Sequence, residues 1–132
     1  MAKLSSKVER MPATVYYFFN LGQGIRKRYV EDIIFNKYEQ KALDIYWQSY
    51  GSLDYHMSDI EKKIWLSNML NRMICDDLSD DLDYVRDNIR YYDITYDEFD
   101  LIEDICWKGI NSEEFTKIIK SYVNKSYIKF FL

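Results

Sequence analysis

The stretch SDIEKKIWLSNMLNRMIC, residues 58–75, decides the fold class of this 132-residue chain. It opens on the pattern of a capping box, in which the Ser58 hydroxyl accepts a hydrogen bond from the Glu61 amide and the Glu61 carboxylate reaches back to the Ser58 amide. Apolar residues then recur every three or four positions, as in an amphipathic helix. They are Ile60, Ile64, Leu70, Met73 and Ile74, with Trp65, Leu66 and Met69 widening the apolar face. We expect this segment to be the central helix of an all-α bundle.

The segments before this stretch also show helical spacing. Pro12 suits the first turn of a helix that ends before Gly22, and Gly22, Gln23 and Gly24 form the turn that follows. From Ile25 a long helix is predicted to run to Gly51, with a break near Asn36 left open. Its apolar residues form two neighbouring stripes, one of Ile25, Tyr29 and Ile33 and the other of Val30, Ile34 and Tyr38.

The segments after this stretch predict three further helices. Ser79 is expected to cap a short helix, and Thr95 with Glu98 repeats the capping-box pattern before a helix that ends at Gly109. Either Asn111 or Ser112 then caps a last helix. The sequence therefore predicts an all-α fold, a compact bundle of five or six helices joined by short turns.

Length and composition fit one domain over residues 1–132. Hydrophobic residues make up 48% of the chain, which is enough to form a core of its own. Residues 1–10 are polar and basic, so we expect them to be flexible. Residues 127–132 are apolar enough to dock onto the body or onto another chain.

Charge is segregated along the chain. Residues 1–30 hold six basic side chains and one acidic one, whereas twelve acidic residues and only two basic ones lie between Asp76 and Asp104. Two like-charge pairs at i,i+4, Asp83 with Asp87 and Asp100 with Asp104, each destabilise an isolated helix by a few tenths of a kcal/mol. Helix capping explains some of these acids, and a solvated acidic face is the alternative that needs no partner.

The acidic block also contains tyrosines, which anchor many protein interfaces. We therefore expect a non-enzymatic, inhibitor- or immunity-type protein that imitates nucleic acid and docks onto a basic partner, such as a nuclease, a toxin or another nucleic-acid-handling protein. Small acidic inhibitors of this kind are often carried by phages and mobile elements, and a homodimer stays open. The predicted partner-binding residues are Asp83, Tyr84, Asp87, Tyr91, Tyr92, Asp97, Asp100 and Asp104.

A second hypothesis places nucleic-acid binding on the basic N-terminal segment. Arg26, Lys27 and Arg28 follow a glycine turn at the start of a predicted helix, where free amides and cations can hold phosphate. Other cations would enlarge this patch if the two ends of the chain meet: Lys3, Lys7, Arg10, Lys117, Lys120 and Lys125.

Other chemistries lack a constellation in this sequence. His56 is the only histidine, so a Ser-His-Asp or Cys-His arrangement would have to use it, and neither cysteine lies near it in sequence. Cys75 and Cys106 are expected to be buried, reduced thiols. The segment from Asp93 imitates a calcium loop but has Glu98 where glycine is required. We predict no metal and no cofactor, and, without a signal peptide or an apolar membrane span, a cytoplasmic protein.

Overall fold

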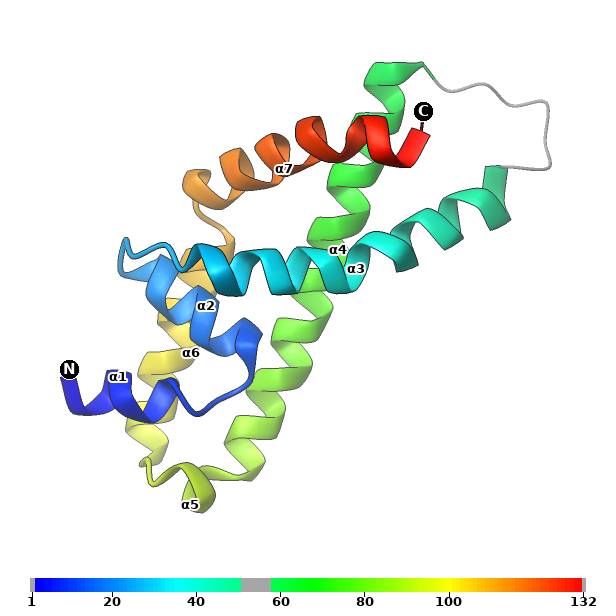
Figure 1. The fold of residues 1–132 in the computed structure, drawn as a ribbon. Coiled ribbons are helices and arrows are strands. Elements are labelled where there is room, and N and C mark those ends of the chain that lie inside the picture. Colours follow the sequence, from blue (N-terminus) through cyan, green and yellow to red (C-terminus); the bar gives the residue numbers. More distant parts are fainter. Residues whose placement is uncertain (1, 51–57, 132) are drawn as a thin grey trace.

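The computed structural model describes residues 2–50 and 58–131, and these residues form seven helices and no strand (Figure 1). This confirms the all-α class. The helices are α1 (Ala2–Val8), α2 (Ala13–Gly22), α3 (Arg28–Tyr50), α4 (Asp59–Asp87), α5 (Ile89–Tyr92), α6 (Tyr96–Ile110) and α7 (Glu113–Phe131). The predicted loop position of His56 and the contacts of the apolar tail after Ser126 lie outside the described residues.

Helix α4 is the central helix, as predicted. The Ser58 capping box is present: the Glu61 amide donates to Ser58 Oγ over 3.2 Å, and the Ser58 amide donates to Glu61 Oε1 over 3.3 Å. A row of leucine and isoleucine side chains is buried along the whole helix, and α2, α3, α6 and α7 all pack against it. The row consists of Leu66, Leu70, Ile74, Leu78, Leu82 and Val85.

Two expectations about element boundaries were wrong. Ser79 caps no helix, because the buried row continues through Leu78 and Leu82 and α4 runs unbroken to Asp87. No break occurs near Asn36, since α3 is continuous over 23 residues. The chain start also differs from the flexible segment that we expected. There α1 forms, and Leu4 and Val8 are buried in the core because their i,i+4 spacing turns both toward α2.

Helix α6 is seated on α2 through two glycines (Figure 1). A Cβ atom added to Gly22 would lie 2.1 Å from the Ile105 carbonyl oxygen, and one added to Gly109 would lie 2.6 Å from the Phe18 carbonyl oxygen. Only glycine allows the two backbones to approach so closely. This seam holds α6 in place and leaves its opposite face to solvent.

Aromatic rings join α2, α3 and α7. The Phe18 ring meets the Phe115 ring edge-on with centroids 4.8 Å apart, and the Phe35 ring stacks on Tyr122 at 4.4 Å. Edge-to-face and offset contacts of this kind stabilise a core beyond their buried area. This cluster therefore fixes the corner at which α2 turns into α3. Within the described residues, no helix combines the length and the apolar character needed to cross a membrane.

Candidate protein-binding surface

The outer face of α4 carries a row of four carboxylates. Asp76, Asp80, Asp83 and Asp87 follow one another at steps of four, three and four, on the side of the helix opposite the buried row. All four are exposed. Arg86 pairs with Asp83 at 3.3 Å and with Asp87 at 3.7 Å, so the end of this row is partly neutralised.

The outer face of α6 carries a second row, Asp97, Asp100 and Asp104, at steps of three and four. These carboxylates lie opposite the buried residues of α6, are exposed, and form no ion pair with any described residue. Two exposed apolar side chains lie beside them: Tyr96 is 71% exposed and Leu101 is 43% exposed. This face therefore combines unneutralised charge with apolar contact area.

The predicted capping box at the start of α6 is present and fixes where this row begins. The Glu98 amide donates to Thr95 Oγ1 over 3.0 Å, and the Thr95 amide donates to Glu98 Oε1 over 2.9 Å. Lys7 of α1 approaches Glu98 at 3.9 Å. Glu98 is thus a structural acid, and it is not part of the free row.

The tyrosines of the α5 tip, which we define as residues 83–96, divide into exposed and buried ones. Tyr84 and Tyr91 are exposed, whereas Tyr92 is only 4% exposed. The Tyr92 ring meets Tyr91 edge-on at 5.0 Å and Tyr84 at 6.5 Å, and burial raises its pKa. We predicted that Tyr92 contacts a partner. It is instead buried, and its ring packs against the two exposed rings of Tyr84 and Tyr91.

A hollow of about 350 Å³ lies between the end of α4, α5 and the start of α6. Its lining includes Tyr91 and Tyr96, together with Arg86, Asp87 and Arg90. Two arginines against one carboxylate mean that this hollow is not acidic. The row of carboxylates that form no ion pair with any described residue therefore lies on the outer face of α6, outside the hollow.

Several acids of the block face inward and hold helices together. Asp77 pairs with Lys37 of α3 at 3.0 Å, and the Thr14 hydroxyl of α2 donates to Asp81 over 2.5 Å. The basic N-terminal segment also reaches the α5 tip, where the Arg10 guanidinium lies 5.6 Å from the centre of the Tyr91 ring. Part of the acid density is therefore used within the fold.

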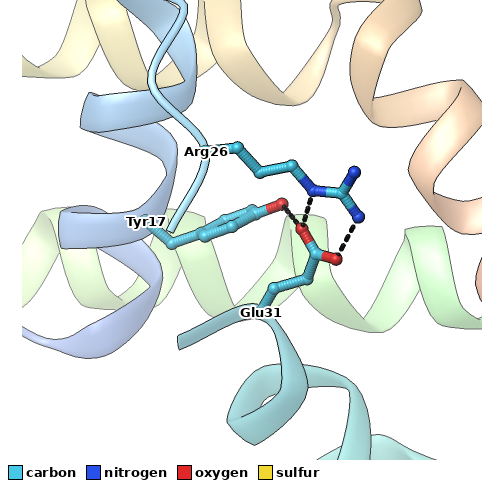
Figure 2. A network of polar contacts seen from close by, with 3 residues as sticks. All are labelled: Tyr17, Arg26 and Glu31. Carbon is cyan, nitrogen blue, oxygen red and sulfur yellow. Dashed lines mark hydrogen bonds and ion pairs between the residues drawn. The ribbon is translucent and has the colours of Figure 1, made fainter. Parts of the chain in front are cut away.

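The α2–α3 corner contains a buried charge network (Figure 2). Glu31, only 6% exposed, accepts from Tyr17 Oη at 2.6 Å and from Arg26 Nε at 2.8 Å on one oxygen, and from Arg26 Nη2 at 2.5 Å on the other. Burial by itself raises the pKa of Glu31, but the bonds from Arg26 and Tyr17 outweigh it and hold that pKa below its ordinary value. Burial and the nearby carboxylate raise the pKa of Tyr17.

This network changes the second hypothesis. Arg26 is bound bidentately to Glu31, so it is not available for phosphate, and Lys27 is half-buried. Arg28 is exposed. The start of α7 lies against this corner, where the Phe115 ring meets Phe18 and the Glu114 carboxylate interacts with Arg26. Lys120 instead lines a separate hollow of about 380 Å³ between α4 and α7.

The described residues contain no group of three or more histidine, cysteine or acidic side chains placed to hold a metal ion. Cys106 is buried as expected, and Cys75 is only half-buried. Desolvation raises the pKa of both thiols, which is the environment of inert cysteines rather than nucleophilic ones.

Comparison with protein-family models, with curated proteins and with solved structures found no match to this chain.

Proposed function

We propose that this protein is a non-enzymatic, cytoplasmic binding module that docks the outer face of α6 onto a basic surface of another protein. The free row Asp97, Asp100 and Asp104 carries this proposal, because these three exposed carboxylates form no ion pair with any described residue. A basic protein surface that normally binds nucleic acid is the kind of surface they would neutralise. The protein would then act as an inhibitor or immunity-type protein.

Each part of the face has a physical role in this proposal. The carboxylates take the place of phosphates, and their field raises the association rate by attracting a basic partner from a distance. Tyr96 and Leu101 supply the packed contacts that slow dissociation. The glycine seam behind α6 holds the row rigid, so little ordering is needed on binding.

The decisive experiment compares two charge reversals with the same spacing. The double variant Asp100→Lys with Asp104→Lys reverses the free row, and the control Asp76→Lys with Asp80→Lys reverses two equally exposed, unpaired acids of α4 at the same i,i+4 spacing. Affinity capture from the source cell, followed by titration of the captured protein, should show binding by the wild type and the control. The α6 variant should bind at least about a hundredfold more weakly.

Two further binding measurements test the inhibitor role. The captured partner should bind a labelled nucleic acid, and this protein should displace it. Retention of the same partner by the α6 variant would refute the proposed face. A partner that binds this protein and nucleic acid together would refute nucleic-acid mimicry.

The second hypothesis, direct nucleic-acid binding, needs a new variant. Arg26→Glu would break the Glu31 network and therefore test folding, so Lys27→Glu with Arg28→Glu is the appropriate pair. Fluorescence anisotropy of labelled DNA and RNA should show no binding at low salt. Binding that falls steeply with salt and is lost in this variant would favour the second hypothesis.

A further inference from the structure

The outer face of α3 exposes large apolar side chains. Tyr29 is 62% exposed, Ile33 60% and Trp47 54%, although the sequence pattern groups Tyr29 and Ile33 with the apolar residues of a core-facing stripe. The buried stripe of α3 is the neighbouring one that contains Val30, Ile34 and Tyr38. The hydroxyls of Tyr29 and Tyr16 lie 3.3 Å apart, which holds the Tyr29 ring in place on the surface.

Six residues on the outer side of α3 follow the spacing of a coiled-coil seam. Their positions are 29, 33, 36, 40, 43 and 47, which alternate steps of four and three residues. Such alternation keeps one stripe facing a partner helix over its whole length. The six residues are Tyr29, Ile33, Asn36, Gln40, Leu43 and Trp47. Five of them are exposed, and Leu43 is half-buried at the edge of the core. At 1.5 Å per residue the stripe is about 27 Å long.

We propose that a second copy of this chain docks on this stripe, with the two α3 helices antiparallel about a two-fold axis. In an antiparallel seam, a positions of one helix meet d positions of the other. The register centred on residue 38 then places apolar residues against apolar ones and amides against amides. The three kinds of layer are Tyr29 against Trp47, Ile33 against Leu43, and Asn36 against Gln40.

The central amide layer favours this one register. The Gln40 amide nitrogen donates to Asp44 of its own chain over 2.8 Å, which leaves the Gln40 carbonyl oxygen to accept from Asn36 of the second copy. Any shift of the helices would place these amides against apolar side chains, at the cost of their hydrogen bonds. A polar layer of this kind selects register and orientation in coiled coils.

The charges next to the axis do not oppose this pairing. Lys37 would lie near Lys37 of the second copy. Within its own chain, however, it is paired with Asp77 at 3.0 Å and lies 5.3 Å from the Tyr38 ring centre. Glu39 is half-buried and lies near Tyr122. Both side chains therefore interact within their own chain.

The size of the stripe sets the expected strength. About 27 Å by roughly 10 Å of helix surface is less than the roughly 800 Å² that each partner buries in a stable complex of standard size. We therefore expect a reversible dimer with a dissociation constant in the micromolar range. The stripe and the acid row lie on different helices, so this proposal stands independently of the proposed function.

Sedimentation equilibrium of the full chain tests the dimer. The wild type should change from monomer to dimer as its concentration rises through the micromolar range. Ile33→Glu should raise the dissociation constant more than about tenfold without loss of helical circular dichroism. Ile64→Glu is the matched control, because Ile64 is 55% exposed on α4 and lies outside the stripe. A wild type that stays monomeric, or a dimer that Ile33→Glu leaves unchanged, would overturn the proposal.

Cysteine cross-linking tests the orientation in a Cys75→Ser background, which removes the half-buried native thiol. A mixture of Ile33→Cys chains and Leu43→Cys chains should form mixed disulfides, and neither variant alone should cross-link with itself. Efficient self-cross-linking of Ile33→Cys would instead show parallel helices and overturn the antiparallel arrangement.

Discussion

The α2–α3 corner and the outer face of α6 both concentrate ionisable side chains, but they hold them in different ways. In the corner, one buried carboxylate accepts three hydrogen bonds, from Tyr17 Oη and from Nε and Nη2 of Arg26. On α6, three exposed carboxylates form no ion pair with any described residue. The comparison separates charge that fixes the path of the chain from charge that stays exposed, which we propose acts on a partner.

The largest effect is expected from breaking the corner. Glu31→Ala leaves Arg26 and the Tyr17 hydroxyl without their acceptor, and we expect the free energy of unfolding to fall by about 2–3 kcal/mol. Urea unfolding followed by far-UV circular dichroism measures this change. Asp32→Ala, an exposed acid next along α3, is the control and should change stability by less than about 0.5 kcal/mol. Equal losses in the two variants would show that the network contributes nothing special.

The next effect comes from titrating the same network. The lowered pKa of Glu31 means that its contribution is present above its ordinary pKa of 4.5 and is lost as the pH falls through the folded value. The raised pKa of Tyr17 has the opposite sense: its contribution is present below about pH 10 and is lost as the pH rises further. Stability measured across pH should therefore fall at both ends. Glu31→Gln should flatten the acid limb, and an unchanged slope would contradict this assignment.

A smaller loss of stability is expected from a change at the start of α6. It tests whether Glu98 is a structural acid, in contrast to the free acids on the same helix. Thr95→Ala removes the acceptor of the Glu98 amide and should lower the free energy of unfolding by about 1 kcal/mol. Thr116→Ala is the control, since the Thr116 hydroxyl is exposed and makes only a long bond to the Ser112 carbonyl. Urea unfolding measures the stability of both variants. Equal stabilities would show that the Thr95 cap does not stabilise the fold.

The smallest effect is expected on the free row itself, and it has the opposite sign. Asp100→Lys replaces a like-charge neighbour of Asp104 by a favourable i,i+4 ion pair and should raise stability by about 0.3–0.5 kcal/mol at low salt. Thermal unfolding should show this gain, and 1 M salt should remove most of it. A loss of stability would mean that Asp100 supports the fold and does not belong with the free charge.

Local sequence signals predicted much of this fold. The capping boxes at Ser58 and Thr95 are present as predicted, because each is decided by four consecutive residues. The prediction at Ser79 was wrong because a serine inside a helix resembles an N-cap in the sequence. The buried leucines on either side of it keep the helix continuous through this position. The apolar residues of α1 are few, so only their contact with α2 makes that segment helical.

The site was less predictable because charge at a position does not reveal its neighbours. The sequence placed Asp83, Asp87, Asp97, Asp100 and Asp104 in one group, yet Arg86 pairs with the first two and none of the described cations pairs with the others. Tyr91 and Tyr92 are the same residue type, so the sequence could not distinguish them. Successive residues of a helix point in different directions, and Tyr92 is the one that points into the core. The signal for the corner was present in the spacing of Arg26 and Glu31, five residues apart across a turn.

The glycine seam between α2 and α6 also bears on how the sequence can change over generations. Gly22 and Gly109 bind α6 through backbone contact, so folding places little demand on positions 97, 100, 101 and 104 on the other side of the helix. Descendants of this chain can vary these positions and keep the same bundle. If the outer face of α6 binds a partner as proposed, the fold and the choice of partner are governed by different residues, and the face can change while the two glycines stay fixed.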